Sequence, residues 1–564
     1  MNFKTQWRMW AVFGAIVLFF LLISGRLFYW QVIAGDQLRV KASAQYSVEF
    51  LLPAARGQIL ASDGSPLVTN QTAFLAYAQP KDIKDISQFS RSVGSVLSLE
   101  DQVLIPKLSA PGRLWVPLAH KVESNIVDTL KSLHLSGLGF EKEPKRYYPE
   151  ASMAGHILGF VGSDGNGNDK GYFGIEGYYD RELRGQNGRI AVERDVRGAP
   201  ILIGDENRIE PEHGRTLMTW IDRSIQRAAE RRLNEGIDKY GAKEGSVVIA
   251  DPKTGGIMAM ASFPSYDPAL FSSYDTMLYR NPTVAASFEP GSTFKVLMMS
   301  AALQEKLVTP ATTIDETGPV QVGEYAVSTW DNKYHGTINM TEVLQHSSNV
   351  GMVAVEKKLG KEKVVRYIRD FGFGEPTGVD LEEELSPQLR KDTDWREIDL
   401  ATASFGQGIA VTPLQMVRAV GALANDGWLM EPHIVKEIRD EKGRVVAIRP
   451  KKIRQVVGSA TAKIMTEMMV SAVDNGEAKW AKPVGYRIAG KTGTAQIPVA
   501  GHYDEKKTIA SFVGFAPADD PKFVMLVTLR EPSSSQWGSE TAAPLFFTIA
   551  RDIFSYLGIP PGAY

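Results

Sequence analysis

The chain has 564 residues, of which 44% are hydrophobic and 23% charged, so it is long enough for two or more globular domains. A formal net charge of −2, without a long basic run, gives no electrostatic basis for binding nucleic acid. Because the sequence contains no cysteine, disulfides, thiol nucleophiles and cysteine-ligated metals are excluded.

The first predicted element is an apolar run over residues 9–33, which is broken at Arg26. The uninterrupted part, residues 9–25, is near the lower length limit for a membrane span. However, Arg26 can extend toward the headgroups, and Tyr29 and Trp30 suit the interface. A cleaved signal peptide is the alternative. Against it, the apolar character persists to Ile33, and no Ala-x-Ala-like cleavage site follows directly. We therefore expect a cytoplasmic tail at residues 1–8, a single-pass anchor in the cytoplasmic membrane, and an extracytoplasmic remainder (periplasmic or at the cell surface).

Residues 34–210 carry short β-like runs divided by turn signals, which predicts a β-rich domain. Residues 56–60 and the following Asp63-Gly64 predict a strand that enters a hairpin. The glycine-rich segment 155–188 contains no P-loop, and its resemblance to a calcium loop fails at the glycine and at the last ligand position. We interpret this segment as turns in a β-rich region.

Residues 211–564 have a different pattern, in which long helical stretches separate two sets of strands. An amphipathic helix begins near Asp222, and strands flank the turn at 251–255 to form a hairpin. Closely spaced β-rich runs suited to antiparallel pairing precede a closing helix over 542–557. These runs are 491–497, 509–515 and 523–529. The pattern predicts an α/β domain built on an antiparallel sheet flanked by helices.

Ser292-Thr293-Phe294-Lys295 is the single Ser-x-x-Lys sequence of the chain. A break at 289–291 and helix-compatible residues after it place Ser292 at a helix N-terminus, with Lys295 one turn further on the same face. A serine hydroxyl becomes a good nucleophile only when a base accepts its proton. Lys295 can serve as that base only if burial or a second cation lowers its pKa. Taken alone, the motif is better explained by a serine cap with a surface lysine, because both roles are common.

A second motif, Ser347-Ser348-Asn349, follows a predicted short helix over 340–346, which Asn349 could end in a turn. Beside Ser292, the Ser347 hydroxyl could relay a proton, and the Asn349 amide could bind Lys295 or a peptide. Taken alone, the motif is a turn or a cap.

The third motif, Lys491-Thr492-Gly493-Thr494, is predicted to lie on a strand. Its lysine supplies the second cation, its hydroxyls suit a carboxylate, and Gly493 allows a substrate backbone to approach. A plain lysine at a sheet edge is the alternative. Lys-Thr-Gly also occurs at 253–255, so the ordered set of motifs is more specific than this element alone.

The histidines offer no competing site. None of the eight lies in an H-E-x-x-H sequence or an i, i+4 pair, so neither a metal site nor a Ser–His–Asp triad is indicated. His346 is adjacent to Ser347, and we assign it a structural role. No cofactor is implied.

With its three motifs in this order, the chain resembles the class B penicillin-binding proteins, which are membrane-anchored peptidoglycan transpeptidases. Further segments carry the resemblance, and they are Arg56-Gly57-x-Ile59 with Asp63-Gly64, Arg146-Tyr147-Tyr148-Pro149, His156-Ile157-Leu158-Gly159-Phe160-Val161-Gly162, Gly174-Ile175-Glu176-Gly177, Glu289-Pro290-Gly291 and Gly406-Gln407-Gly408. The resemblance implies a dimerisation-type pedestal at 34–210 and a transpeptidase domain at 211–564 with the penicillin-binding and serine β-lactamase-like fold.

The resemblance also implies roles for the motif residues. Ser292 would attack the penultimate carbonyl of a stem peptide that ends in D-Ala-D-Ala, and D-Ala would leave. Lys295 would be the base and Ser347 the proton relay, with Asn349 also in the catalytic group. Lys491, Thr492 and Thr494 would bind the terminal carboxylate, and the N–H groups of Ser292 and Thr494 would form the oxyanion hole. β-Lactams would acylate Ser292.

Several functional alternatives stay open. Glu289-Pro290-Gly291 and Asn349 resemble division-type members, and the alternative is an elongation-type enzyme that acts in cell shape. The resemblance implies a SEDS-family membrane polymerase and divisome or elongasome proteins as partners. A serine β-lactamase or β-lactam sensor and a non-catalytic scaffold are the remaining alternatives; the long N-terminal region argues against a β-lactamase.

Overall fold

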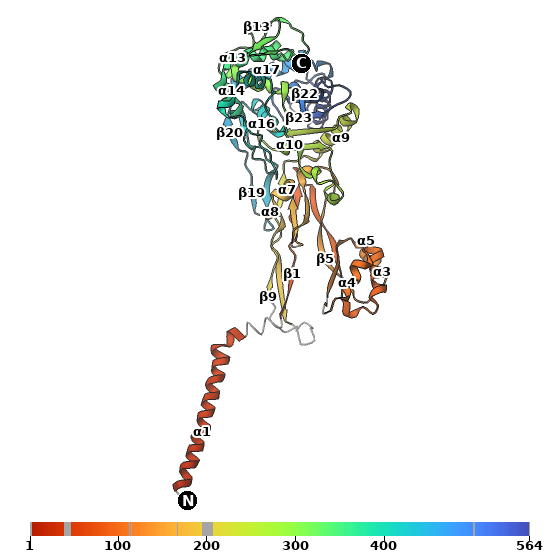
Figure 1. Cartoon of the computed structure of the whole chain (residues 1–564), viewed down its shortest axis with the longest axis vertical. Coiled ribbons are helices and arrows are strands. Elements are labelled where there is room, and N and C mark those ends of the chain that lie inside the picture. The colour runs from red at the N-terminus through yellow and green to blue at the C-terminus, as the bar shows by residue number, and fades with distance from the viewer. Residues whose placement is uncertain are drawn as a thin grey trace. The chain divides into compact units, whose positions relative to one another are not determined.

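The computed structural model describes residues 3–38, 47–111, 113, 115–165, 167–193, 207–499 and 502–562 (Figure 1). The chain divides into two compact units. One unit comprises Met1–Ala55 with Gly185–His213, and the other comprises Arg56–Arg184 with Gly214–Tyr564.

The first unit contains the apolar helix and a small sheet. Helix α1 (Phe3–Phe28) continues into a π-helical turn at Tyr29–Ile33, and the stretch Gln6–Ile33 is long and apolar enough to cross a membrane. This helix contains the predicted anchor. The sheet is antiparallel, in the order β1-β8-β9. Its strands are β1 (Ser47–Leu52), β8 (Gly188–Glu193) and β9 (Asn207–Ile209).

In the second unit, one sheet joins strands from the N-terminal and C-terminal regions. Its order is β19-β18-β10-β2-β3-β4, and β5 also pairs with β3. Strand β2 runs antiparallel to β3 after the turn at Asp63-Gly64, which confirms the predicted hairpin. The strands are β2 (Ile59–Leu60), β3 (Pro66–Ala78), β4 (Val116–Val122), β5 (Leu138–Tyr147), β10 (Thr216–Thr219), β18 (Val435–Arg439) and β19 (Val445–Ala447).

Three helices pack beside β3, β4 and β5 through small apolar clusters, as Figure 1 shows near the label of β5. They are α3 (Ile86–Leu97), α4 (Asp101–Ser109) and α5 (Ser124–Ser132).

The glycine-rich segment contains more helix than predicted. Its hairpin of β6 (Phe160–Ser163) and β7 (Asp169–Tyr172) lies among the short helices α6 (Gly155–Leu158), α7 (Gly174–Tyr178) and α8 (Asp180–Arg184). The sequence of this segment shows mainly turn residues because each helix is only four or five residues long, which is too short to show a helical period.

A buried ionic network holds these short helices. Arg56 donates to Glu176 Oε2 at 2.7 Å and to Asp180 at 2.8 Å, while Arg146 donates to Glu176 Oε1 at 2.6 Å. The Glu176 side chain is fully buried, so removal of either arginine would leave an incompletely paired charge out of water.

A five-stranded antiparallel sheet forms the core of the C-terminal region, in the order β12-β11-β23-β22-β21. This confirms the predicted hairpin and the pairing of the last strands, and it places β21 at an edge. The strands are β11 (Glu244–Ala250), β12 (Ile257–Phe263), β21 (Ala489–Val499), β22 (His502–Ala516) and β23 (Phe523–Arg530).

Both faces of this sheet are covered. Val247 belongs to the cluster shared with α9 (Arg223–Tyr240) and α18 (Ala542–Tyr556), whereas the next residue, Val248, belongs to the cluster shared with α16 (Pro413–Leu423). Helix α9 begins after the Asp222 cap and α18 closes the fold, as predicted.

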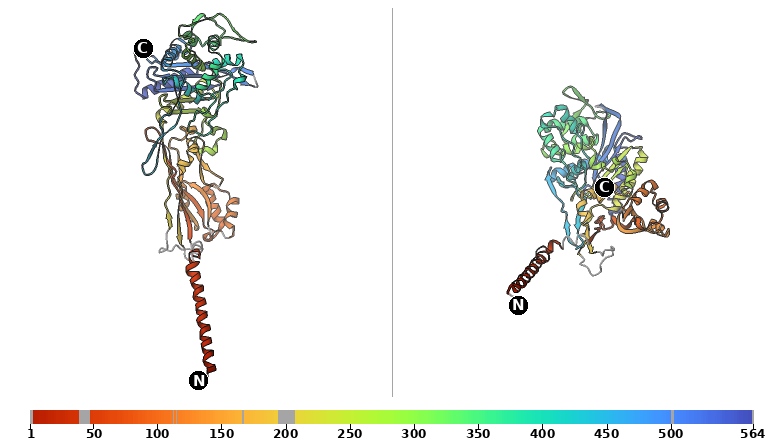
Figure 2. Two further views of the ribbon diagram at one scale, coloured as in Figure 1. Left: turned by 90° about the vertical axis from the view of Figure 1, so that its left-hand side faces the viewer. Right: turned by 60° about the horizontal axis from the view of Figure 1, so that its bottom comes forward.

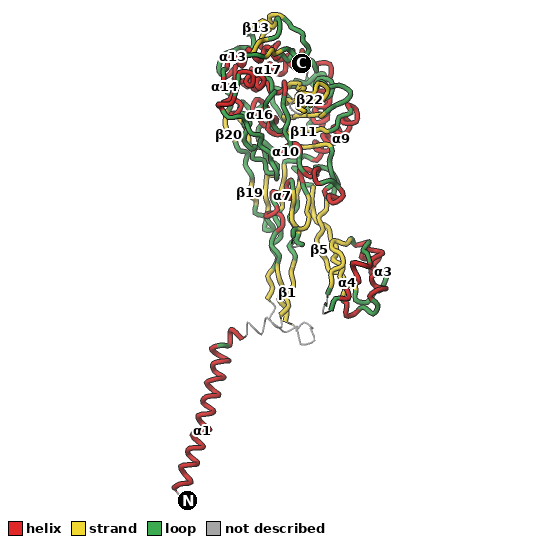
Figure 3. The backbone as a smooth tube through the Cα atoms, viewed as in Figure 1, coloured by secondary structure: helices red, strands yellow, loops and turns green. Residues whose placement is uncertain are grey.

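A helical lobe lies beside the sheet, and Figure 2 shows the two side by side from other directions. Figure 3 shows its helices gathered next to β11 and β22. Its helices are α10 (Pro282–Ala285), α11 (Lys295–Gln304), α12 (Met340–Gln345), α13 (Asn349–Leu359), α14 (Lys361–Asp370), α15 (Glu397–Ser404) and α17 (Ser459–Asn475). Short hairpins complete it, namely β13 (Thr313–Glu316) with β16 (Gly336–Asn339), β14 (Val320–Val322) with β15 (Tyr325–Val327), and β17 (Trp428–Met430) with β20 (Lys452–Gln455). Helix α11 is buried on nearly all sides, as expected of a central helix.

Candidate active site

Ser292 lies in a 3₁₀ turn, Gly291–Phe294, that leads directly into α11. The helical turn confirms the expected local geometry, although the α-helix itself starts three residues later, at Lys295. The Gly291 N–H donates to the Gly406 carbonyl at 3.0 Å, which ties the turn to the Gly-Gln-Gly loop. Ser292 is half-buried, whereas Thr293 is fully buried. Of the two hydroxyls in this turn, that of Ser292 is therefore on the accessible residue.

Lys295 is fully buried and joins the first motif to the second. Its Nζ donates to the carbonyl oxygen of Ser347 and, at 2.8 Å, to Asn349 Oδ1. Ser347 Oγ lies 3.4 Å from the same nitrogen. Among the described residues, no hydrogen bond joins Lys295 Nζ to Ser292 Oγ. The base candidate is thus held on the side of the second motif in this state.

Burial is the main cause that lowers the pKa of Lys295 well below its usual value of 10.5, and the nearby charge of Lys491 lowers it further. Glu477 and Glu316 act in the opposite direction. Charge on an amine in this position is disfavoured by lost hydration and by a like charge. The arrangement favours the neutral amine that proton abstraction requires.

The second motif spans the junction between two helices. Helix α12 ends at Gln345, and Ser348 caps α13 by accepting a hydrogen bond from the Gly351 N–H at 2.8 Å. Asn349 therefore starts a helix, whereas the sequence indicated that it ends one. Its Nδ2 donates to the Ser328 carbonyl at 3.1 Å, which leaves Oδ1 directed at Lys295.

The third motif lies on the edge strand β21, as predicted. Lys491 is 3% exposed, and its Nζ donates to Thr492 Oγ1 at 3.0 Å. Thr494 Oγ1 accepts a hydrogen bond from the Gly538 N–H at 3.0 Å. The 3₁₀ turn that carries Ser292 packs against this strand. All three motifs therefore meet in one place.

Gly493 is required by packing within the chain. A Cβ atom at this position would lie 2.4 Å from Ser511 Oγ and 2.8 Å from Thr293 Cγ2. The sequence explained Gly493 by the approach of a substrate. The structure adds the close contact of β21 with β22 and with the 3₁₀ turn Gly291–Phe294 that carries Ser292, the candidate nucleophile turn.

Comparison with known proteins assigns the family. Residues 245–554 match the penicillin-binding protein transpeptidase domain, and residues 51–219 match the penicillin-binding protein dimerisation domain. Stage V sporulation protein D of Bacillus subtilis is 35% identical over 557 residues, which cover 98% of this chain and 85% of the relative. This chain belongs to the class B penicillin-binding proteins. The peptidoglycan D,D-transpeptidase FtsI of Escherichia coli is 30% identical over 568 residues, which cover 99% of this chain and 93% of FtsI.

Solved structures of penicillin-binding proteins have the same fold. Penicillin-binding protein 2X of Streptococcus thermophilus matches with a TM-score of 0.74 and 25% identity over 91% of this chain and 80% of that one. Penicillin-binding protein 3 of Mycobacterium tuberculosis, solved in complex with aztreonam, matches with a TM-score of 0.70 and 27% identity over 91% and 98%. The chain is a serine-type transpeptidase with a pedestal and a penicillin-binding catalytic domain.

Two carboxylates at the site of this penicillin-binding protein were not found from the sequence. Glu477, just after α17, accepts a hydrogen bond from Thr492 Oγ1 at 3.2 Å. Glu316 in β13 is fully buried and accepts from Ser348 Oγ and, at 2.9 Å, from His335 Nδ1. Neither belongs to a local motif, so only the tertiary fold brings them to the site.

His346 lies behind the second motif. Its ring stacks on His335 with centroids 3.9 Å apart and planes at 11°. Burial is the larger cause that lowers the pKa of His346, and the neighbouring His335 lowers it further. Among the described residues, no group of three or more histidine, cysteine, aspartate or glutamate side chains is arranged to hold a metal ion.

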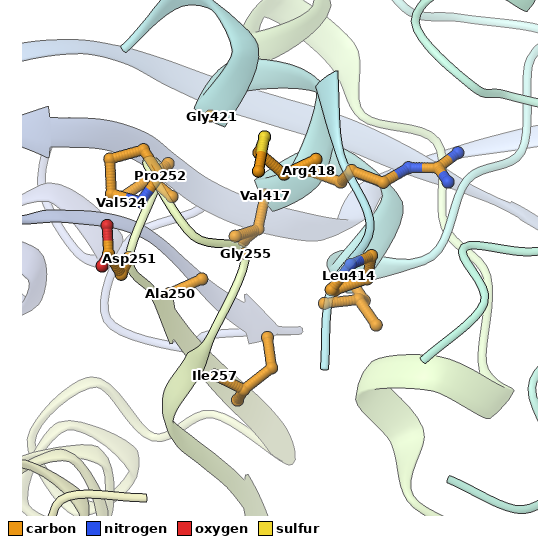
Figure 4. Close-up of a pocket in the computed structure, with 12 residues that line it drawn as sticks. Ala250, Asp251, Pro252, Gly255, Ile257, Leu414, Val417, Arg418, Gly421 and Val524 are labelled. Carbon is orange, nitrogen blue, oxygen red and sulfur yellow. The ribbon is translucent and has the colours of Figure 1, made fainter. Parts of the chain in front are cut away.

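The second Lys-Thr-Gly sequence forms the turn between β11 and β12, as interpreted from the sequence. Thr254 Oγ1 donates to Asp251 Oδ2 at 2.9 Å, and Lys253 pairs with Asp520. Gly255 lines an apolar cavity of about 20 Å³, enough for about one water molecule (Figure 4). Figure 4 also shows the Arg418 guanidinium directed away from the cavity, where it donates to the Gly372 carbonyl at 2.6 Å.

Proposed function

We propose that the chain cross-links peptidoglycan stem peptides through an acyl-enzyme on Ser292, in septal wall synthesis. The observation that carries the proposal is the convergence of three motifs on one buried amine. Lys295 Nζ donates hydrogen bonds to Ser347 and Asn349. Burial is the main cause that lowers the pKa of Lys295, and the charge of Lys491 lowers it further. A buried, hydrogen-bonded amine next to a half-exposed serine suits nucleophilic catalysis.

In the first step, neutral Lys295 accepts the Ser292 proton, and Oγ attacks the penultimate D-Ala carbonyl. Lys295 Nζ must move toward Ser292 for this step, since its present partners belong to the second motif. The tetrahedral intermediate then collapses, the C–N bond breaks, and the proton passes through Ser347 to the departing D-Ala amine. An acceptor amine attacks the ester and releases Ser292 with its proton restored.

The remaining motif residues bind and polarise the substrate. Lys491, Thr492 and Thr494 bind the terminal carboxylate, since an ammonium and two hydroxyls on an edge strand suit a planar anion. Backbone N–H groups of Ser292 and Thr494 stabilise the oxyanion. Packing of the nucleophile turn against β21 supports this pairing. Asn349 holds Lys295, and Gly493 keeps the turn and the strand in contact.

We infer the location from the anchor and the partners from the family. Residues 1–8 lie in the cytoplasm, 9–33 span the cytoplasmic membrane, and the pedestal (34–210) and transpeptidase domain (211–564) lie outside it. The apolar helix Gln6–Ile33 supports this topology. A SEDS-family polymerase and divisome proteins are the proposed partners, and anionic β-lactams are the proposed inhibitors. An elongation role, with elongasome partners, is the second candidate.

One kinetic experiment separates the enzymatic alternatives. The purified chain is mixed with a chromogenic β-lactam and, separately, with a stem peptide ending in D-Ala-D-Ala. The proposal predicts one stoichiometric burst, a stable adduct, and D-Ala release that Ser292→Ala abolishes. Sustained β-lactam turnover would instead identify a β-lactamase.

The cellular role is tested by depletion of the protein followed by microscopy. Filamentous cells support septal synthesis, whereas rounded cells support the elongation role. A Ser292→Ala protein that restored normal growth would favour the scaffold alternative.

A further inference from the structure

Glu477 places a carboxylate of the protein itself at the subsite proposed for the substrate carboxylate. We propose that Glu477 is a resident occupant of this anion subsite, which the substrate carboxylate must displace, so that it limits affinity for anionic ligands. This inference rests on the proposed function, because it takes Lys491 and Thr492 as the carboxylate-binding residues.

The direction of the hydrogen bonds carries the first step. Thr492 Oγ1 accepts a hydrogen bond from Lys491 Nζ at 3.0 Å and donates its own proton to Glu477 Oε2 at 3.2 Å. A threonine hydroxyl has one proton to donate. A substrate carboxylate can only accept hydrogen bonds, so it can bind the Thr492 hydroxyl only after the hydrogen bond from Thr492 to Glu477 has broken.

The fold fixes the backbone of Glu477 but leaves its side chain free to move. Helix α17, which ends two residues earlier, packs against both β21 and α12. The next residue, Ala478, is 2% exposed and belongs to the core beneath the sheet. The Glu477 side chain is half-buried, and no described lysine or arginine lies within salt-bridge distance of it. Displacement therefore requires a side-chain rotation only.

Electrostatics supports the same conclusion. Burial lowers the pKa of Lys491, and Glu477 is the neighbouring charge that opposes this shift. Glu477 acts in the same way on Lys295, along with Glu316. The carboxylate of Glu477 thus supplies to the site the negative charge that a substrate carboxylate would supply. Two carboxylates that share one site repel each other, so the substrate and Glu477 compete.

The test compares Glu477→Gln with the unaltered protein. Glutamine keeps an oxygen that can accept the Thr492 proton but removes the charge. Asp474→Asn is the matched control, since it removes one charge from α17 at a residue that pairs with Lys482. The measurement is the second-order rate constant of acylation by benzylpenicillin and by its methyl ester, with the melting temperature of each variant recorded.

We expect Glu477→Gln to accelerate acylation by benzylpenicillin about tenfold, a change of ~1.4 kcal/mol, because the competing charge is lost. The methyl ester, which carries no carboxylate, should be accelerated less than benzylpenicillin, because it gains only from the lower pKa of Lys295 that the loss of Glu477 causes. Asp474→Asn should match the unaltered protein. Glu477→Ala should also accelerate benzylpenicillin, which covers the case of a poorly folded glutamine variant.

An equal or slower reaction of both Glu477 variants with benzylpenicillin would overturn the inference, as would equal acceleration of the ester. These outcomes differ from a failure of the proposed function. If the unaltered protein forms an adduct on Ser292 but the variants react no faster, only the role of Glu477 is wrong. If no adduct forms on Ser292, the proposed function itself fails.

Discussion

Lys-Thr-Gly occurs twice in this chain, and the two lysines lie in opposite surroundings. Lys491 is 3% exposed on an edge strand, bonds to Thr492, and is one of the causes that lower the pKa of Lys295. Lys253 lies on a hairpin turn with a side chain that is 51% exposed, and it pairs with the exposed carboxylate of Asp520. The same three residue types thus place a buried lysine beside Lys295 in one segment and form an exposed hairpin turn in the other.

The difference between the two segments lies in what surrounds each lysine. A solvated lysine keeps its proton and contributes little through a surface ion pair. A desolvated lysine that faces a second amine changes the proton affinity of that amine. Reactivity therefore depends on burial and on the neighbours that the fold supplies, which three letters of sequence do not specify.

The sharpest way to break this comparison is to remove each lysine in turn. Lys491→Ala should lower the acylation rate by a fluorescent penicillin about 10²–10³-fold, because it removes the anion-binding charge and the cation that helps to keep Lys295 neutral. Lys253→Ala should leave the rate unchanged. Rates measured on matched protein concentrations check this, and comparable losses in both variants would contradict the assignment.

Substituting the glycine of each Lys-Thr-Gly sequence, Gly493 or Gly255, should have a smaller effect than removing Lys491. In Gly493→Ala the new Cβ would meet Ser511 Oγ at 2.4 Å, so β21 must shift from the nucleophile turn, and acylation should fall about tenfold. Gly255→Ala would place its Cβ 2.4 Å from the Glu431 carbonyl at a φ of +81°. It should lose about 1–3 kcal/mol of folding free energy but acylate normally.

Denaturant unfolding and acylation kinetics on the same preparations separate these effects. A Gly255→Ala protein that stays folded but acylates as slowly as Gly493→Ala would show that the site is sensitive to strain anywhere in the sheet.

The smallest predicted effect is a pH shift caused by Glu316. Acylation should increase with pH as Lys295 loses its proton, with a midpoint below 10.5. Glu316 raises the pKa of Lys295, so Glu316→Gln should lower that pKa and move the midpoint to lower pH. Asp315→Asn, on the exposed side of β13, is the control. A midpoint that stays in place or moves upward would refute the coupling.

Local signals in the sequence were sufficient for much of this fold. Residues 251–255 predicted a turn because Asp, Pro and Gly favour one, and closely spaced β-rich runs predicted the last three strands. The order of Ser292, Ser347 and Lys491 predicted the candidate site, since these residues themselves make up the three motifs.

Tertiary contacts explain what the sequence could not indicate. Glu316 and Ser348 are 32 residues apart, and Glu477 and Thr492 are 15 apart. Neither the helical nor the strand periodicity of the sequence relates residues that are this far apart. The start of α13 at Asn349 depends on the Ser348 cap, which the sequence does not distinguish from an ordinary turn serine.

The central claim is that Ser292 is the residue that becomes acylated. The most direct test is mass spectrometry of the intact protein and of its peptides after reaction with benzylpenicillin. The account predicts the mass of one ring-opened penicillin, carried by the peptide that contains Ser292 and missing from Ser292→Ala. An adduct that persists in Ser292→Ala, or that maps to Ser347, would contradict it.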